Sequence, residues 1–175
     1  MFRIRAARPE DTAELGRVHV RGWQWGYRGQ IPAGILDNLD PAERARGWRE
    51  VMAEPGRGVS ILLAEREDDG RVVGMASCGP SREPDGRTGE VYAIYIEEAV
   101  AGIGLGAALL RHAVATLQGQ GFERAILWVL ATNARARRFY EREGWHADGA
   151  AKADDYRGFP LDEVRYVRGD LASDG

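Results

Sequence analysis

The sequence predicts one α/β domain in which a mixed central sheet of about six to seven strands is flanked by about four helices. Two observations lead to this prediction. Segments with the period of strands and of helices follow one another in the order β, α, α, three strands, α, β, α, two strands. The chain has 175 residues, of which 44% are apolar, so it can bury one core without disulfide or metal support. We assign residues 1–171 to this domain and expect residues 172–175 to fray.

The N-terminal part of the domain is predicted to contain one strand and two helices. Residues 2–8 alternate apolar and charged side chains, as a strand with one buried face does. The first helix is expected to begin near Asp11, whose spacing to Glu14 suits a capping box. The second helix has Asp40 as its cap and Pro41 at its first position, a combination typical of helix starts.

The later segments complete a sheet that contains one crossover. Asp69-Gly70 between two apolar runs predicts a hairpin. In the middle of the chain a strand, a helix and a further strand form a unit whose two strands are expected to be parallel. The predicted strands after the first are residues 61–64, 71–78, 90–96, 125–130, 145–150 and 164–167, and the later helices are residues 105–117 and 133–143.

Composition and charge exclude several classes of function. The chain has 24 basic and 27 acidic residues, and its net charge of −3 provides no global positive field for a nucleic acid. Cys78 is the only cysteine and the three histidines are scattered, so we expect no metal site. The longest uncharged apolar run, residues 99–110, is too short to span a bilayer, and the N-terminus lacks the apolar core of a secretion signal. We therefore expect a cytoplasmic protein with neither a nucleic acid nor a membrane partner.

Three glycines at alternate positions form the segment Gly102-Ile103-Gly104-Leu105-Gly106 between a predicted strand and a predicted helix. Glycine lets backbone amides approach a ligand, and the amides at a helix N-terminus attract anions such as a pyrophosphate. The alternative is a tight turn without a ligand. A Walker-type phosphate loop would need a lysine, which this segment lacks. A dinucleotide fingerprint ending at Ala107 fits less well, because the acidic residue about 20 positions later, Glu123, precedes the next strand.

Two segments carry a family resemblance. Residues 95–110 run from a strand through a short acidic connection to Gly-x-Gly-x-Gly-Ala-Ala-Leu-Leu. About 30 residues further along lies a second pattern, made of Asn133, Ala136, Phe139, Tyr140, Gly144 and Trp145. In this order and spacing, the two segments resemble the GNAT superfamily of acetyl-CoA-dependent N-acetyltransferases. The resemblance covers nearly the whole chain and implies the family's α/β fold, with acetyl-CoA as the acetyl donor.

The resemblance also implies roles for individual residues. The backbone of one strand is expected to pair with the pantetheine arm, the amides of the glycine segment to hold the pyrophosphate, and Asn133 to hydrogen-bond the pantetheine. Tyr140 is expected to lie beside the thioester sulfur and to protonate the departing thiolate. The family usually has Gln or Arg where this chain has Ala101, so one side-chain contact to the phosphates is lost. The cofactor-binding residues implied in this way are Ile94, Tyr95, Ile96, Gly102, Ile103, Gly104, Leu105, Gly106, Ala107 and Asn133.

The acetyl-transfer chemistry also needs a polarised carbonyl, a base and an acceptor site. A backbone amide can polarise the thioester carbonyl if the strand that carries Ile94 separates from its neighbour. For the base we favour Glu90, on that same strand and also near the acceptor, with a solvent-facing strand residue as the alternative. Trp23 and Tyr27 could line an acceptor pocket through cation–π contacts, and the alternative is that they close the core between two helices.

Taken together, the residues and the resemblance imply an N-acetyltransferase that acts on a primary amine, with a small molecule as the favoured acceptor. Three alternatives stay open. The chain could acetylate a protein N-terminus or lysine, bind acyl-CoA as a non-catalytic sensing module, or bind a dinucleotide as an oxidoreductase. The expected partners are acetyl-CoA and the amine, and a homodimer is left open.

Overall fold

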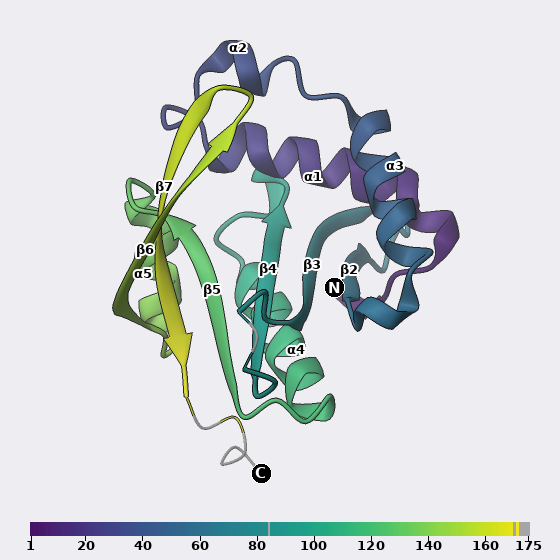
Figure 1. The fold of residues 1–175 in the computed structure, drawn as a ribbon. Coiled ribbons are helices and arrows are strands. Elements are labelled where there is room, and N and C mark those ends of the chain that lie inside the picture. The colour runs from purple at the N-terminus through teal and green to yellow at the C-terminus, as the bar shows by residue number, and fades with distance from the viewer. Residues whose placement is uncertain (84, 170, 172–175) are drawn as a thin grey trace.

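The computed structural model describes residues 1–83, 85–169 and 171, and the predicted tail at residues 172–175 lies outside the described residues (Figure 1). Within these residues the chain forms one seven-stranded sheet with helices on both faces. The strands are β1 (Phe2–Ala6), β2 (Ser60–Arg66), β3 (Val72–Pro80), β4 (Thr88–Ile96), β5 (Arg124–Leu130), β6 (His146–Tyr156) and β7 (Phe159–Arg168). The helices are α1 (Thr12–Gly26), α2 (Ala33–Leu36), α3 (Pro41–Met52), α4 (Leu105–Gly119) and α5 (Ala134–Arg142).

The sheet has the mixed topology that the sequence predicts. Its strands lie in the order β1-β2-β3-β4-β5-β7-β6. All neighbours are antiparallel except β4 and β5, which are parallel. Parallel neighbours need a long crossover connection, and α4 provides it. The predicted fold class, a single α/β fold with six to seven strands and about four helices, is confirmed, and the short α2 is the one additional helix.

Each face of the sheet has its own apolar core. On one face lie α1 and α3 (Figure 1), and there Leu15 and Val18 of α1 pack against Leu63 and Met75 of the sheet. On the other face, the α4 side chains, Leu109 among them, share a larger core with strand residues and with aromatic residues of α5. The two helical layers leave the centre of the sheet, where β4 and β5 meet, accessible from its ends.

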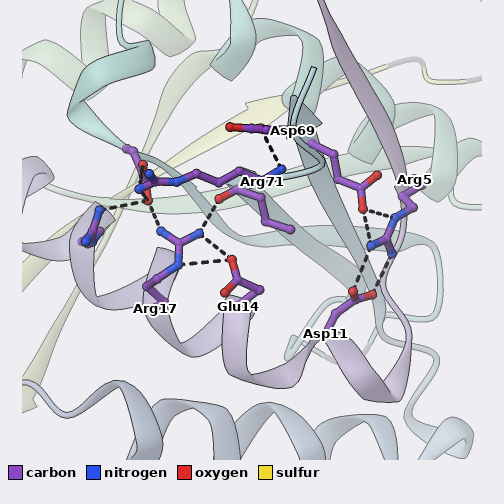
Figure 2. A network of polar contacts seen from close by, with 10 residues as sticks. Arg5, Asp11, Glu14, Arg17, Asp69 and Arg71 are labelled. Atoms are coloured by element: carbon purple, nitrogen blue, oxygen red, sulfur yellow. Dashed lines mark hydrogen bonds and ion pairs between the residues drawn. The ribbon is translucent and has the colours of Figure 1, made fainter. Parts of the chain in front are cut away.

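The start of α1 corrects one prediction. Asp11 does precede the helix, but its side chain makes no capping bond, so the predicted capping box with Glu14 is wrong. Its carboxylate instead accepts hydrogen bonds from the Arg5 guanidinium at 2.7 and 2.9 Å and from the backbone N–H of Arg8 (Figure 2). The Arg5 guanidinium competes successfully for the carboxylate because a bidentate bond joins two opposite charges, whereas a cap would pair the carboxylate with an uncharged N–H. The cap predicted for α3 is confirmed, since Asp40 accepts from the N–H of Ala42 at 2.8 Å.

The last two strands are longer than their sequence pattern predicts. β6 and β7 form a hairpin that continues to the pair Tyr156↔Phe159. Residues 154–156, expected in a loop between these strands, therefore belong to β6. The pairing with β7 supplies backbone hydrogen bonds along residues of low strand propensity, which local sequence patterns do not report.

Candidate functional site

The sheet opens between its two parallel strands. The ladder of β4 and β5 contains three residue pairs and ends at Glu90↔Ile126, although the strands continue to Ile96 and Leu130. Along β4 the pairing with β3 has a bulge at Tyr92, two residues after the last pair with β5, and a bulge bends a strand. The backbone edges of residues 91–96 and 127–130 consequently border a gap. The expectation that the strand carrying Ile94 separates from its neighbour is confirmed.

A cavity of about 480 Å³ occupies this gap. Five parts of the chain form its walls: the C-terminal end of α1, the separated halves of β4 and β5, the glycine segment and α5. The wall residues are Gly22, Trp25, Gly26, Tyr27, Val91, Tyr92, Ala93, Ile94, Tyr95, Ile96, Ala101, Gly102, Gly104, Gly106, Ala107, Leu127, Trp128, Val129, Asn133, Arg135, Ala136, Phe139, Tyr140, Arg142 and Glu143.

One end of the cavity is built from backbone. Gly102 and Gly104 line it with positive φ angles of 82° and 86°, and α4 begins directly afterwards. This backbone conformation favours glycine, and it places the amides of the segment before the helix N-terminus. Ile103 is 59% exposed and Leu105 packs in the core, so neither side chain is a wall of the cavity. The predicted pyrophosphate site requires only the backbone of these two residues.

Arginines of α5 also line the cavity. They are Arg135 and Arg142, and the Arg135 guanidinium lies 3.9 Å from the centre of the Trp25 ring. Arg137 faces elsewhere, since its Nε donates to the Tyr166 hydroxyl at 3.1 Å. The free amides of the glycine segment make its end suitable for phosphate groups, and the two arginines add positive charge to the cavity.

Other residues that the resemblance singled out also line the cavity. Ile94, Tyr95 and Ile96 of β4 line it, as does Asn133, which is buried at the start of α5. The Asn133 Oδ1 accepts from the N–H of Ala136 at 3.1 Å, so this residue caps the helix and leaves its amide nitrogen as a donor. The structure thus brings these residues together at one cavity, and their cofactor contacts stay a prediction.

Three tyrosines from three elements meet at the other end. Tyr27 ends α1, Tyr95 lies on β4 and Tyr140 on α5, and all three line the cavity. Burial raises the pKa of each hydroxyl, and the neighbouring tyrosine charge adds to this effect for Tyr27 and Tyr140. All three hydroxyls are therefore protonated at neutral pH and can act as donors.

The close contact of α1 with β4 depends on a glycine. A Cβ at Gly22 would lie 2.6 Å from the Cβ of Tyr95, a distance that real side chains do not tolerate. Trp23, next in the helix, is not a wall of the cavity but packs against Tyr27 and Tyr156 with ring centres 5.0 and 4.9 Å apart. Of these two residues predicted for the acceptor pocket, Tyr27 lines the cavity, and Trp23 packs against Tyr27 without lining it.

Glu90, predicted as the base, lies away from this cavity. Its side chain is 1% exposed and its carboxylate accepts from the backbone N–H of Arg82 at 3.2 Å and from the Arg82 guanidinium. Glu90 is not among the wall residues. The structure therefore does not bring Glu90 and Tyr140 together at the cavity.

Sequence reasoning missed several residues beside the cavity. Tyr92 and Trp128 line it, and Lys152 of β6 places its Nζ 4.6 Å from the centre of the Trp128 ring. The same Nζ pairs with Glu163 of β7 at 3.3 Å. These side chains come from four strands, so only the sheet register brings them together, and no local spacing could have found them.

Other chemistry has little support among the described residues. In residues 1–83, 85–169 and 171 no group of three or more His, Cys, Asp or Glu side chains could hold a metal ion. Cys78 is buried, and burial raises the pKa of its thiol to about 12, which makes it a poor nucleophile. Over the same residues, no helix is long and apolar enough to cross a membrane.

Comparisons with known proteins agree with this geometry. The Acetyltransferase (GNAT) family matches residues 9–145. The uncharacterized N-acetyltransferase YuaI of Bacillus subtilis is 34% identical over 134 residues, which cover 76% of this chain and 74% of that protein. The fold is shared with PaiA N-acetyltransferase from Thermoplasma acidophilum, solved with coenzyme A, at a TM-score of 0.74 and 17% identity over 97% of this chain and 99% of that chain. YncA from Salmonella typhimurium, solved with its cofactor acetyl-CoA, gives a TM-score of 0.72 at 25% identity over 97% of this chain and 94% of that chain.

Proposed function

The chain belongs to the acetyltransferase (GNAT) family, and we propose that it transfers the acetyl group of acetyl-CoA to a primary amine of a small molecule. The opening between β4 and β5 is the observation that carries this proposal. At one end the cavity in this opening is lined by the backbone amides of the glycine segment, and at the other by tyrosine hydroxyls that can donate hydrogen bonds. A thioester placed in the opening would lie between the two ends.

The residues present fit acetyl-CoA. The unpaired backbone edges of residues 91–96 and 127–130 are strand edges inside a sheet, and such edges hydrogen-bond extended ligands that carry amides, as the pantetheine arm does. The amides of residues 102–107, before and within the first turn of α4, suit the pyrophosphate, and Arg135 and Arg142 add positive charge. Ala101 cannot make the phosphate contact that Gln or Arg makes in the family, but the amide site does not depend on that side chain.

In this mechanism the thioester supplies an activated acyl group, and the chain's residues orient it and move protons. Backbone N–H groups on the free edge of β4 polarise the thioester carbonyl. The Tyr140 hydroxyl donates a proton to the departing sulfur. Because burial raises the pKa of Tyr140 above that of a typical thiol, about 8.5, this transfer is uphill and its contribution is moderate.

The acceptor end favours a small amine. Aromatic rings of Tyr27, Tyr95 and Trp128 surround it, and such rings attract a protonated amine. The net charge of −3 also favours cationic acceptors over acidic ones.

A panel of acceptors incubated with acetyl-CoA tests the proposal. We expect small primary alkylamines to release free thiol and to gain an acetyl group by mass spectrometry. Release only with peptides would replace the small molecule by a protein N-terminus or lysine. Tight binding of acetyl-CoA without transfer to any amine would instead indicate a non-catalytic binding module.

The variant Tyr140→Phe tests the proton donor. The ring stays in place, so we expect acetyl-CoA affinity to change little while kcat falls about 10- to 1,000-fold, at or below the usual range for acid catalysis. The matched control is Tyr166→Phe, whose hydroxyl binds Arg137 and Glu141 outside the cavity and should affect Tm instead of kcat. A wild-type kcat in Tyr140→Phe, in an assay limited by chemistry, would mean that water protonates the sulfur.

A further inference from the structure

A charge pair on β6 and β7 lies beside the acceptor end of the cavity. Lys152 Nζ is 3.3 Å from Glu163 Oε2, and the two side chains are 31% and 19% exposed. Lys152 is the only lysine in a chain that otherwise uses arginine. Within the described residues, Lys152 is the ion-pair partner of Glu163.

The sheet register places this pair next to the cavity wall. Glu163 lies opposite Leu130 on β5, two residues beyond the wall residue Trp128. Lys152 lies opposite Glu163 on β6, with its Nζ over the Trp128 ring at 4.6 Å. Leu130 itself packs in the cluster that includes Tyr27. Glu163 is thus between two walls of the acceptor end, one from β5 and one from α1.

Charged and titratable groups from several elements face Glu163. Lys152 approaches it from β6, Tyr27 from α1, Tyr95 from β4 and Arg82 from the connection between β3 and β4, while β5 contributes the apolar Leu130. Burial is the largest cause of the raised pKa of Tyr27 and Tyr95, and the charge of Glu163 raises both further. The carboxylate therefore lies within electrostatic reach of two cavity hydroxyls.

Other candidate bases near the cavity are already engaged. Glu90 is fully buried, and its carboxylate accepts several hydrogen bonds from Arg82. Burial, with the charge of Arg44, lowers the pKa of His19 to about 3, and its Nδ1 accepts a bond from Trp48 at 3.2 Å. Glu143 lines the opposite end and pairs with Arg111 at 3.3 Å. Glu163 is also not a wall residue, but it adjoins the wall through Lys152, whose Nζ pairs with it and lies over the ring of the wall residue Trp128. Unlike Glu90 and Glu143, it has no arginine in its ion pair.

We propose that Glu163 accepts the proton of the acceptor's ammonium group and that Lys152 positions this carboxylate. This inference rests on the acetyl transfer proposed above and assigns it a base from β7 in place of Glu90. The acceptor class it implies is an alkylamine that is protonated at neutral pH.

The proton and bond changes balance as follows. Glu163 takes one proton from the ammonium, and the neutral amine forms a C–N bond to the thioester carbonyl carbon. The C–S bond then breaks, and the sulfur gains a proton from Tyr140, which recovers one from the acetylated nitrogen. The net products are the N-acetyl amine, coenzyme A with a free thiol, and one proton that Glu163 returns to solvent.

The test is the pH profile of kcat/KM for an alkylamine that the wild-type protein acetylates. In Glu163→Gln we expect kcat/KM at pH 7 to fall about 100- to 10,000-fold, the usual range for a general base. The profile should then rise about tenfold per pH unit until the pH reaches the pKa of the acceptor's ammonium group, because only neutral amine reacts. In Lys152→Met we expect kcat to fall while acetyl-CoA affinity stays near the wild-type value, because the carboxylate loses the ammonium group that holds it in place.

A matched control is Glu123→Gln, which also removes a glutamate from an ion pair, here with Arg87, but has no contact with a wall residue's partner and should keep the wild-type profile. An unchanged profile in Glu163→Gln, or an equal fall at every pH, overturns the proposal. If Glu163→Gln does not fold by circular dichroism, the fall of kcat at unchanged acetyl-CoA affinity in Lys152→Met decides, and its absence overturns the proposal. A wild-type protein without transfer to any amine refutes both proposals, whereas transfer with an unchanged Glu163→Gln profile refutes only this one.

Discussion

The two ends of the cavity are built in different ways. The phosphate end consists mainly of the backbone of one contiguous segment, residues 101–107, placed before α4. The acceptor end consists of side chains, with Tyr27 from α1, Tyr95 from β4, Trp128 from β5 and the adjoining Glu163 from β7. A site of the first kind needs a particular backbone conformation, and a site of the second kind needs a particular register between strands.

This difference has a consequence for variation. Replacing one glycine at the phosphate end changes the backbone that every amide shares, so a single substitution can remove the site. At the acceptor end each side chain contributes separately, so substitutions should change which amine binds and how fast it reacts. The following predictions test this contrast.

Gly104→Val should have the largest effect. Gly104 has φ +86°, a conformation that costs other residues about 1–2 kcal/mol, and a branched side chain would stand among the amides. We expect acetyl-CoA affinity to fall at least about 100-fold by calorimetry, with circular dichroism unchanged. Gly121→Val is the matched control, because Gly121 has φ +88° and lies outside the cavity wall. Equal affinity in the two variants would place the phosphate site elsewhere.

Tyr27→Ala should have an intermediate effect that is confined to the acceptor. Removing a cavity wall that is also packed in a core cluster should raise the acceptor KM about tenfold and lower the free energy of unfolding by about 3 kcal/mol. Acetyl-CoA affinity should stay near the wild-type value. Trp23→Leu, which alters the packing behind Tyr27, should lower stability with little change in KM. A wild-type KM in Tyr27→Ala would assign Tyr27 to the core alone.

Glu97→Gln should have the smallest effect, because it acts on the connection between the two ends. Glu97 follows β4, and its carboxylate is buried. It forms ion pairs with Arg17 and Arg21 of α1 and with Arg71, just before β3 (Figure 2 shows Arg17 and Arg71). Weakening this network should loosen the segment before Gly102 and raise the Kd of acetyl-CoA about threefold.

The acceptor KM of Glu97→Gln should not change. Glu14→Gln removes the other carboxylate that binds Arg17, without contact to the glycine segment, and is its control. A change in acceptor KM larger than the change in acetyl-CoA Kd would contradict the view that the network serves the phosphate end.

Local patterns predicted most of the fold. The Asp69-Gly70 hairpin, the Asp40 cap and the parallel crossover around α4 all appear in the structure, because each depends on residues close together in the chain. Predictions failed where a distant partner decided the outcome. Asp11 binds Arg5 instead of capping α1, and β7 extends β6 through residues 154–156.

Local sequence was enough for the fold class and for the glycine segment that we propose for the phosphates, since periodicity, caps and alternate glycines act through neighbours along the chain. The set of side chains that line the rest of the cavity follows from the three-dimensional packing. The β4–β5 separation after Glu90, the packing of Tyr27 against Trp23, and the approach of Lys152 to Trp128 and to Glu163 all depend on strand register and helix packing. The physical reason is that a one-residue change of register moves every side chain of a strand to the other face, and no local pattern fixes that choice between distant strands.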